Sequence, residues 1–225
     1  MLNGPIPYSL GCLTSLTCLY LGSNLINGSI PPQIANIRKL SYYLSLNNNK
    51  LIGPIPSAMG HLINLVTLFL NSNKFNGSIP WDIRNLTKLA SLELSVNNLS
   101  GSIPSFLSGL TSLRALNIHS NQINGMINSE IEYCTLLEQL DLSNNNIYGI
   151  IPYELILLTH LHILKLSSKK LSGMIPLGIE NLDILMVIDL YKNELIGSIS
   201  TEFLILWRSF FWVTTKLGKH SLSIL

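Results

Sequence analysis

Leucine recurs along the chain at the spacing L-x-x-L-x-L-x-x-N-x-L-x-G, in which x is a residue of any type. The copy from Leu65 to Gly77 is representative and reads LVTLFLNSNKFNG. Seven copies fit this frame without a gap, and an eighth, from Leu40 to Gly53, has one extra residue. The glycine of the frame returns after 24 residues at every step except one, which takes 25 residues. A fixed period of this length predicts a repeat architecture.

The alternation inside each copy predicts a short strand. In the representative copy the leucines would face a core, while Thr67, Phe69 and Asn71 would face outward. One such strand cannot bury its leucines alone. Stacking of successive copies pairs the strands in a parallel sheet and joins the leucines into one continuous core, so we expect a solenoid.

The asparagine that follows each strand is expected to turn inward, where its amide can both donate to and accept from backbone groups at the bend. These positions form a predicted structural ladder: Asn24, Asn49, Asn73, Asn97, Asn121, Asn145 and Asn193. In the seventh strand-bearing coil the position is Lys169. Because a lysine cannot accept a hydrogen bond and its charge is costly to bury, we expect its amine to reach solvent and the solenoid to open most easily there.

The segment after each strand predicts the return to the outer side. Glycine permits a positive φ and proline fixes φ, so the recurring G-x-I-P is expected to be a turn that leaves the sheet. Apolar residues follow the glycine by six, nine and twelve positions, as at Ile83, Leu86 and Leu89. This spacing predicts a short helical or 3₁₀ segment.

The complete frame, L-x-x-L-x-L-x-x-N-x-L-x-G-x-I-P, resembles the plant-type extracellular leucine-rich repeat of receptor-like kinases, receptor-like proteins and polygalacturonase-inhibiting proteins. The resemblance implies an α/β leucine-rich-repeat solenoid, a right-handed curved superhelix with a parallel β-sheet on its concave face and short helical or 3₁₀ segments and turns on its convex face. We assign residues 1–206 to this solenoid, as a partial first coil and eight strand-bearing coils, and residues 207–225 to an irregular tail.

Three features depart from the family pattern. The paired cysteines of the amino-terminal cap are absent, the frame fails after Leu206, and no Gly-rich phosphate loop, H-R-D or D-F-G run of a kinase occurs. The sequence is therefore interpreted as an excerpt of an ectodomain or as the product of a truncated gene. Both ends present apolar residues without a recognisable polar cover, so we expect the tail to serve as a cap or the chain to associate.

Composition excludes several classes of partner. Of the 225 residues 47% are hydrophobic and 12% charged, and the net charge of +2 gives no basic field for nucleic acid or anionic membranes. The mean hydropathy of +0.38 would suit a membrane protein. However, the longest apolar candidate, 203–213, is much shorter than the roughly 20 residues of a spanning helix. We therefore expect neither a transmembrane helix nor a signal peptide in this sequence.

The outward positions of the strands are the candidate binding surface. Aromatic residues gather in the first three coils and charged residues in the last five, and exposed aromatics beside Asn and Ser are typical of recognition surfaces. The candidate ligand-binding residues are Tyr20, Tyr43, Phe69, Glu93, Asn117, Asp141, Lys165 and Asp189. The alternative is that these are unselected surface residues of a decayed fragment.

Other chemistry is weakly supported. His160 and His162 form an H-x-H without a third ligand, and a nucleophile paired with a base is missing, so we expect no metal, no cofactor and no enzymatic activity. The cysteines imply no disulfide framework, and Cys134 stands at a core position usually filled by leucine. Four N-x-[ST] sequons predict glycosylation near surface turns, at Asn27, Asn76, Asn85 and Asn98.

The resemblance implies a function in ligand recognition. We expect the extracellular sensing module of a plant receptor-like kinase or receptor-like protein, located at the outer face of the plasma membrane or in the cell wall. Its partners would be a peptide or protein ligand on the concave face and a co-receptor ectodomain. The alternatives are a secreted inhibitor of a cell-wall hydrolase, of the polygalacturonase-inhibitor type, and a truncated product without function.

Overall fold

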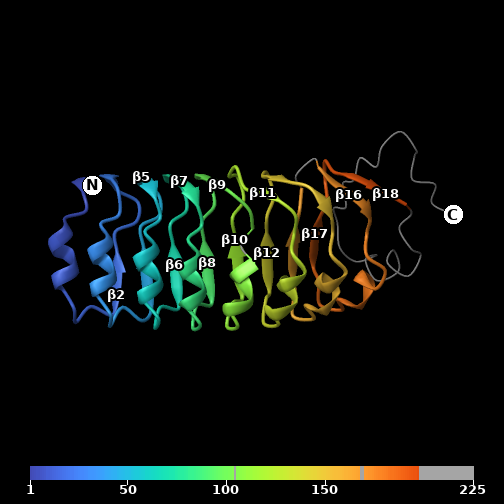
Figure 1. Ribbon diagram of the computed structural model, residues 1–225, viewed down its shortest axis with the longest axis horizontal. Coiled ribbons are helices and arrows are strands. Elements are labelled where there is room, and N and C mark those ends of the chain that lie inside the picture. Colours follow the sequence, from blue (N-terminus) through green and yellow to red (C-terminus); the bar gives the residue numbers. More distant parts are fainter. Residues whose placement is uncertain (104, 168–169, 198–225) are drawn as a thin grey trace.

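The computed structural model describes residues 1–103, 105–167 and 170–197. Figure 1 shows these residues as a row of similar coils stacked along one axis. The position of Lys169 and the tail at 207–225 lie outside the described residues. The predictions made for them are therefore not examined by the structure.

One face of the stack is a parallel eight-stranded sheet with one strand from each coil, in the order β17-β15-β12-β10-β8-β6-β4-β2. Each strand is three residues long and occupies the alternating segment of the repeat. The strands are β2 (Cys18–Tyr20), β4 (Tyr43–Ser45), β6 (Thr67–Phe69), β8 (Ser91–Glu93), β10 (Ala115–Asn117), β12 (Gln139–Asp141), β15 (Ile163–Lys165) and β17 (Val187–Asp189).

A second set of strands lies along the flank of the stack, at or next to the repeating glycine. They form sheets of five, two and three parallel strands, in the orders β1-β3-β5-β7-β9, β11-β13 and β14-β16-β18. Their bounds are β1 (Asn3–Pro5), β3 (Leu25–Gly28), β5 (Lys50–Pro54), β7 (Lys74–Ser78), β9 (Asn98–Ser100), β11 (Asn124–Gly125), β13 (Asn146–Ile147), β14 (Gly149–Ile150), β16 (Leu171–Met174) and β18 (Glu194–Ile196).

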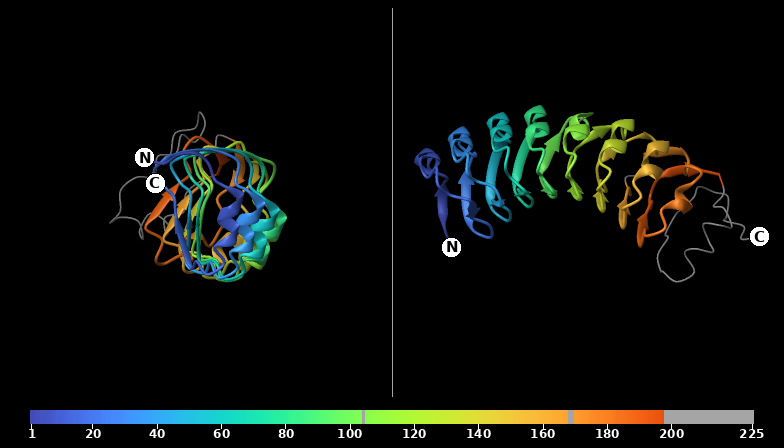
Figure 2. Two further views of the ribbon diagram at one scale, coloured as in Figure 1. Left: turned by 90° about the vertical axis from the view of Figure 1, so that its left-hand side faces the viewer. Right: turned by 90° about the horizontal axis from the view of Figure 1, so that it is seen from below.

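Short 3₁₀ helices form the opposite side of the coils. Where the structure describes the residue before the helix, it is a proline or Asn in an extended conformation in six cases. The helices are η1 (Tyr8–Cys12), η2 (Pro32–Asn36), η3 (Ser57–His61), η4 (Trp81–Asn85), η5 (Ser105–Gly109), η6 (Ser129–Tyr133), η7 (Tyr153–Leu157) and η8 (Ile179–Asn181). Figure 2 shows the stack bent into an arc with these helices on its outer side and strands on its inner side.

The core runs without interruption along the stack. The leucines of the frame and the isoleucine of G-x-I-P are buried in nearly every described coil; Leu65, Leu68 and Leu70, for example, have no exposed surface. The alternation of the strands and the spacing of the 3₁₀ helices therefore produce the predicted leucine-rich solenoid.

A residue in the left-handed backbone region stands immediately before each of the seven ladder asparagines. Such residues are Ser23, Asn48, Ser72, Val96, Ser120, Asn144 and Lys192, with φ between 52° and 56°. Most are small or polar, as expected where φ is positive, but Val96 is β-branched and strained there.

The ladder asparagines tie neighbouring coils together. Asn73, for example, donates to the carbonyls of Leu46 at 2.9 Å and Leu70 at 3.2 Å, and accepts from the Leu51 amide at 3.0 Å. Equivalent bonds are made by Asn49, Asn97, Asn121, Asn145 and Asn193. In the described part of the chain no buried side-chain nitrogen or oxygen lacks a hydrogen-bond partner.

The extra residue of the 25-residue coil is accommodated before strand β4. There the Ser41 and Tyr42 amides both donate to the Thr17 carbonyl, each at 3.1 Å. Strand β4 still pairs in the common register, with Tyr43 opposite Cys18 on one side and Thr67 on the other. The insertion therefore leaves the alignment of the concave sheet unchanged.

Candidate ligand-binding face

The parallel register arranges seven of the eight candidate residues in one row across the concave sheet. With Ser45 on β4, the row reads Tyr20, Ser45, Phe69, Glu93, Asn117, Asp141, Lys165 and Asp189. Tyr43 lies in the adjacent row, between Cys18 and Thr67. The row exists because equal repeats stack in register, so one position of each coil becomes one line of side chains.

The amino-terminal end of the face is aromatic. The rings of Tyr20 and Tyr43 lie 5.5 Å apart between centroids and are tilted by 32°. Tyr20 is 62% exposed and Tyr43 40% exposed. Phe69 follows on β6 and is half-buried. These three rings supply apolar contact area that is accessible from the concave side.

The carboxyl-terminal end of the face is charged and internally hydrogen bonded. Asp141 lies 3.6 Å from the Lys165 ammonium and accepts from the Ser143 hydroxyl at 2.6 Å. Asp189 accepts from the Ser167 hydroxyl at 2.9 Å and from the Tyr191 amide at 2.9 Å. Both aspartates therefore have partners inside the protein.

Glu93 lies at the centre of the row, between Phe69 on β6 and Asn117 on β10. Burial raises its pKa to about 7, a hydrogen bond with Asn117 opposes that rise, and the charge of Asp141 adds to it. Glu93 therefore keeps its proton to a higher pH than an ordinary glutamate, and it lacks the ammonium that lies beside Asp141.

Not all outward-facing positions are exposed. Thr67, predicted to face outward, is only 7% exposed, and Ser45, Ser95 and Ser143 are also buried. In the sheet register Thr67 lies between Tyr43 on β4 and Ser91 on β8, in the interior of the concave face. The accessible part of the face is thus the row of larger side chains.

Comparison with known proteins agrees with the repeat architecture. Two family models described as leucine rich repeat match the chain, one at residues 15–37, 42–62 and 64–86 and the other at 87–147. These stretches together span more than half of the 225 residues. The chain belongs to the leucine-rich-repeat family. A comparison with curated proteins finds no match.

Solved structures similar to this leucine-rich-repeat protein include plant receptor ectodomains. The ectodomain of the Arabidopsis thaliana receptor kinase GASSHO1/SCHENGEN3, in complex with CASPARIAN STRIP INTEGRITY FACTOR 2, is 35% identical with a TM-score of 0.85, and the match covers 88% of this chain and 24% of that one. The plant peptide hormone receptor RGFR1 in complex with RGF2 is 39% identical with a TM-score of 0.85, covering 88% and 31%. The Arabidopsis receptor kinase HAESA in complex with the peptide hormone IDA and the co-receptor SERK1 is 34% identical with a TM-score of 0.83, covering 90% and 34%.

The chain therefore spans only about a quarter to a third of the length of these ectodomains. Its fold resembles a portion of plant receptor ectodomains, and two of these were solved in complex with a peptide hormone.

The four sequon asparagines are all exposed. Asn27, Asn76 and Asn98 lie on the flank strands β3, β7 and β9, and Asn85 ends η4. Their side chains are accessible to modification, and none of them belongs to the concave row.

The repeat alignment also contains a flank surface that the sequence reasoning missed. The residue after the repeating glycine is Pro or Ser in the first five coils, and then becomes Met126, Ile150 and Met174. These three side chains are exposed and each lies against the glycine of the next coil, at Gly149, Gly173 and Gly197. The change from small to large apolar residues in one alignment column would have revealed this stripe.

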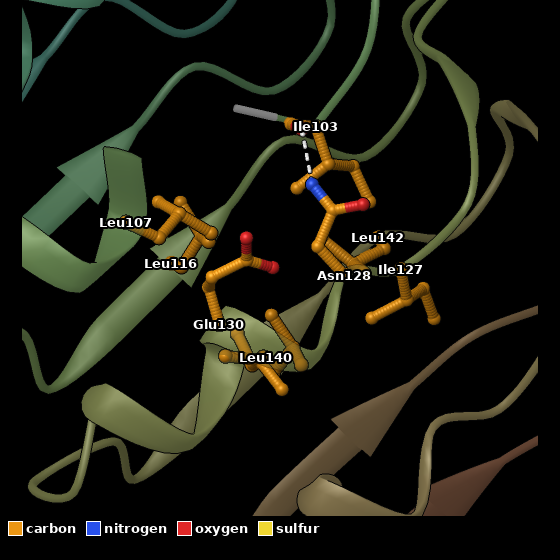
Figure 3. A pocket seen from close by; sticks show the side chains of 9 residues that line it. Ile103, Leu107, Leu116, Ile127, Asn128, Glu130, Leu140 and Leu142 are labelled. Carbon is orange, nitrogen blue, oxygen red and sulfur yellow. Dashed lines mark hydrogen bonds between the residues drawn. The ribbon is translucent and has the colours of Figure 1, made fainter. Parts of the chain in front are cut away.

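A cavity in the core is too small to be a ligand site. It has a volume of about 10 Å³, room for about one water, and lies near Leu107, Leu116, Leu140 and the carboxylate of Glu130 (Figure 3). Asn128, which replaces the proline of G-x-I-P, donates to the Ile103 carbonyl at 3.3 Å at its edge.

The remaining candidate chemistry does not form a cluster. His160 contacts the Thr135 carbonyl at 3.0 Å, and no group of three potential metal ligands occurs in the described residues. All three cysteines are unpaired; Cys134 is buried, and burial raises its pKa to about 11. In the same part of the chain, no helix has the length and hydropathy needed to cross a membrane.

Proposed function

We propose that this chain is a ligand-recognition segment of an extracellular plant receptor-type protein, and that it binds an extended peptide on its concave face. The observation that carries the proposal is the row of large side chains aligned in register, aromatic at one end and charged at the other. The peptide-bound receptor ectodomains among the similar structures support it.

The dimensions suit an extended ligand. Eight strands about 4.8 Å apart give a face of roughly 34 Å, which matches about ten residues at around 3.3 Å each. A peptide that crosses the strands would contact Tyr20, Tyr43 and Phe69 at one end. It would meet the paired charges of Asp141 and Lys165 at the other.

The aromatic end would supply most of the affinity. Burial of apolar area contributes about 25 cal/mol per Å², whereas an exposed ion pair contributes about 0–1 kcal/mol. The charged end would mainly set the orientation of the peptide. The same proposal includes binding of a co-receptor ectodomain. It also includes glycosylation of the four sequon asparagines, Asn27, Asn76, Asn85 and Asn98.

A library of displayed ten-residue peptides, selected on the immobilised chain, tests this function. We expect Tyr43→Ala and Phe69→Ala to weaken binding of the selected peptides at least tenfold, and Asp141→Ala or Lys165→Ala to weaken it less. Tyr153→Ala is a matched control, because Tyr153 is an exposed tyrosine on η7 of the convex side. Loss of binding in the Tyr153 variant with full binding in the concave-face variants would refute the proposal.

A further inference from the structure

The three carboxylates of the concave row have different surroundings. Asp141 is close to an ammonium and accepts from a hydroxyl, and Asp189 accepts from a hydroxyl and a backbone amide. Glu93 forms no ion pair within the described residues. Asp189 also lacks an ion pair but accepts two hydrogen bonds, whereas the partner given for Glu93 is the single neutral amide of Asn117.

The location of Glu93 makes the absence of a cationic partner unfavourable for its ionised form. The side chain is half-buried, and burial is the largest cause of its raised pKa, whereas Asn117 provides a neutral hydrogen bond that only partly offsets it. A poorly solvated carboxylate without a cationic neighbour is stabilised when a cation binds beside it. Lys165 is the nearest lysine of the row, but three strand spacings, roughly 14 Å, separate it from Glu93.

The neighbour on the other side of Glu93 is aromatic. Phe69 is directly opposite Glu93 in the pairing of β6 with β8. The other outward-facing pair of these two strands, Thr67 and Ser91, is uncharged. A carboxylate beside an aromatic ring is suited to guanidinium or ammonium, because the carboxylate pairs with the charge and the ring contacts the cation or its alkyl stem.

We propose that Phe69 and Glu93 form a subsite for one cationic side chain, arginine or lysine, of a peptide ligand. This subsite deepens the proposed function and rests on it. It fixes the register of the ligand, since the cation must lie at the border between the aromatic and charged halves of the row. The carboxylate–guanidinium pair supplies specificity, and the rings of the aromatic end supply contact area.

Cation binding at this subsite should depend on pH. The other ionisable groups near Glu93 are His119, which follows β10, and Asp141 on β12; β6 contributes Phe69 and no ionisable group to this part of the row. Since the pKa of Glu93 is raised to about 7, the carboxylate is mostly ionised at pH 8 and mostly protonated at pH 6. The ionised fraction, and with it the preference for a cation, falls about tenfold between these values.

The test uses two fluorescein-labelled probes, Tyr-Gly-Arg-Gly-Tyr and the same peptide with citrulline in place of arginine. Citrulline has the shape of arginine but no charge. By fluorescence anisotropy at pH 8 we expect the full chain to bind the arginine probe about tenfold more tightly than the citrulline probe. Glu93→Gln should abolish that ratio, and Glu194→Gln, a matched control at an exposed position of the flank strand β18, should retain it.

The outcomes separate the subsite from the proposed function. Equal binding of both probes, an unchanged ratio in the Glu93→Gln variant, or no binding of either probe at 1 mM overturns the subsite. If both probes bind but Tyr43→Ala and Phe69→Ala change neither affinity, the concave face is not the binding surface and the proposed function fails as well. A ratio that disappears at pH 6 supports the assignment to Glu93.

Discussion

The ladder asparagines should differ in their contribution to stability, and Asn145 should contribute more than Asn121. Both are turned into the stack and make the same set of bonds. They differ in how many of their backbone partners have a second hydrogen bond. The substitutions Asn145→Ala and Asn121→Ala therefore remove similar side-chain bonds but leave different numbers of backbone groups unpaired.

Replacement of Asn121 leaves one group unpaired. The Leu94 carbonyl, its acceptor, also receives a bond from Asn97 at 3.0 Å, and the Ile118 carbonyl also receives one from Asn145 at 3.0 Å. The Leu99 amide, which donates to Asn121 at 2.9 Å, loses its acceptor. One buried unpaired group costs about 1–3 kcal/mol.

Replacement of Asn145 leaves two groups without a side-chain partner among the described residues. The Ile118 carbonyl keeps its bond from Asn121, but the Leu142 carbonyl loses the Asn145 donor at 3.1 Å and receives no second side-chain hydrogen bond from the described part of the chain. The Ile123 amide also loses its acceptor, at 3.0 Å. The expected cost is about 2–6 kcal/mol, roughly twice that of Asn121→Ala.

Urea unfolding followed by far-ultraviolet circular dichroism, with both variants and the parent chain under identical conditions, measures the difference. Asn146→Ala is the neighbouring control, because this exposed asparagine makes no side-chain hydrogen bond to the described residues, and it should change stability by less than about 0.5 kcal/mol. Equal destabilisation by Asn121→Ala and Asn145→Ala would show that shared carbonyls do not control the energetics of the ladder.

Three further predictions follow from individual side chains. Val96→Asn should stabilise the chain by about 1 kcal/mol in urea unfolding, because it relieves a β-branched residue at positive φ whose side chain is exposed; destabilisation would contradict the strain. The parent chain should lose stability as the pH rises from 4.5 to 7, and Glu93→Gln should remove that loss. Over that range the folded chain retains a proton that the unfolded chain has released, a difference on the order of 1–2 kcal/mol after solvent screening; parallel pH profiles would contradict the raised pKa. Cys134 should react with a thiol reagent at pH 8 only on unfolding, since it is buried and its pKa is raised to about 11, whereas Cys12 should react in the native chain; rapid labelling of all three thiols would contradict this packing.

The architecture could be predicted from the sequence because every repeat carries the same pattern of leucines, asparagine and glycine. Period-two leucines predict strands, and the equal spacing fixes which residues become neighbours across the sheet, so the row from Tyr20 to Asp189 followed from counting. The structure added the pairing of Asp141 with Lys165, whose positions are 24 residues apart and therefore adjacent in register.

Other properties of the face depend on the size and chemistry of neighbours, which a pattern does not specify. The low exposure of Thr67, 7%, is not specified by its outward position in the repeat. The raised pKa of Glu93 depends on the solvation of a single position. The sharing of the Ile118 carbonyl by Asn121 and Asn145 could not be read from the repeat either, because it requires the distances between coils.

The accommodation of the 25-residue coil has an evolutionary consequence. Because Ser41 and Tyr42 take up the additional length before β4, the strand keeps its partners on both sides. The lineage of such a protein can therefore vary the length of a loop in one coil without shifting the residues that contact a ligand several coils away. Selection on the binding row and drift in the connecting segments can then proceed independently.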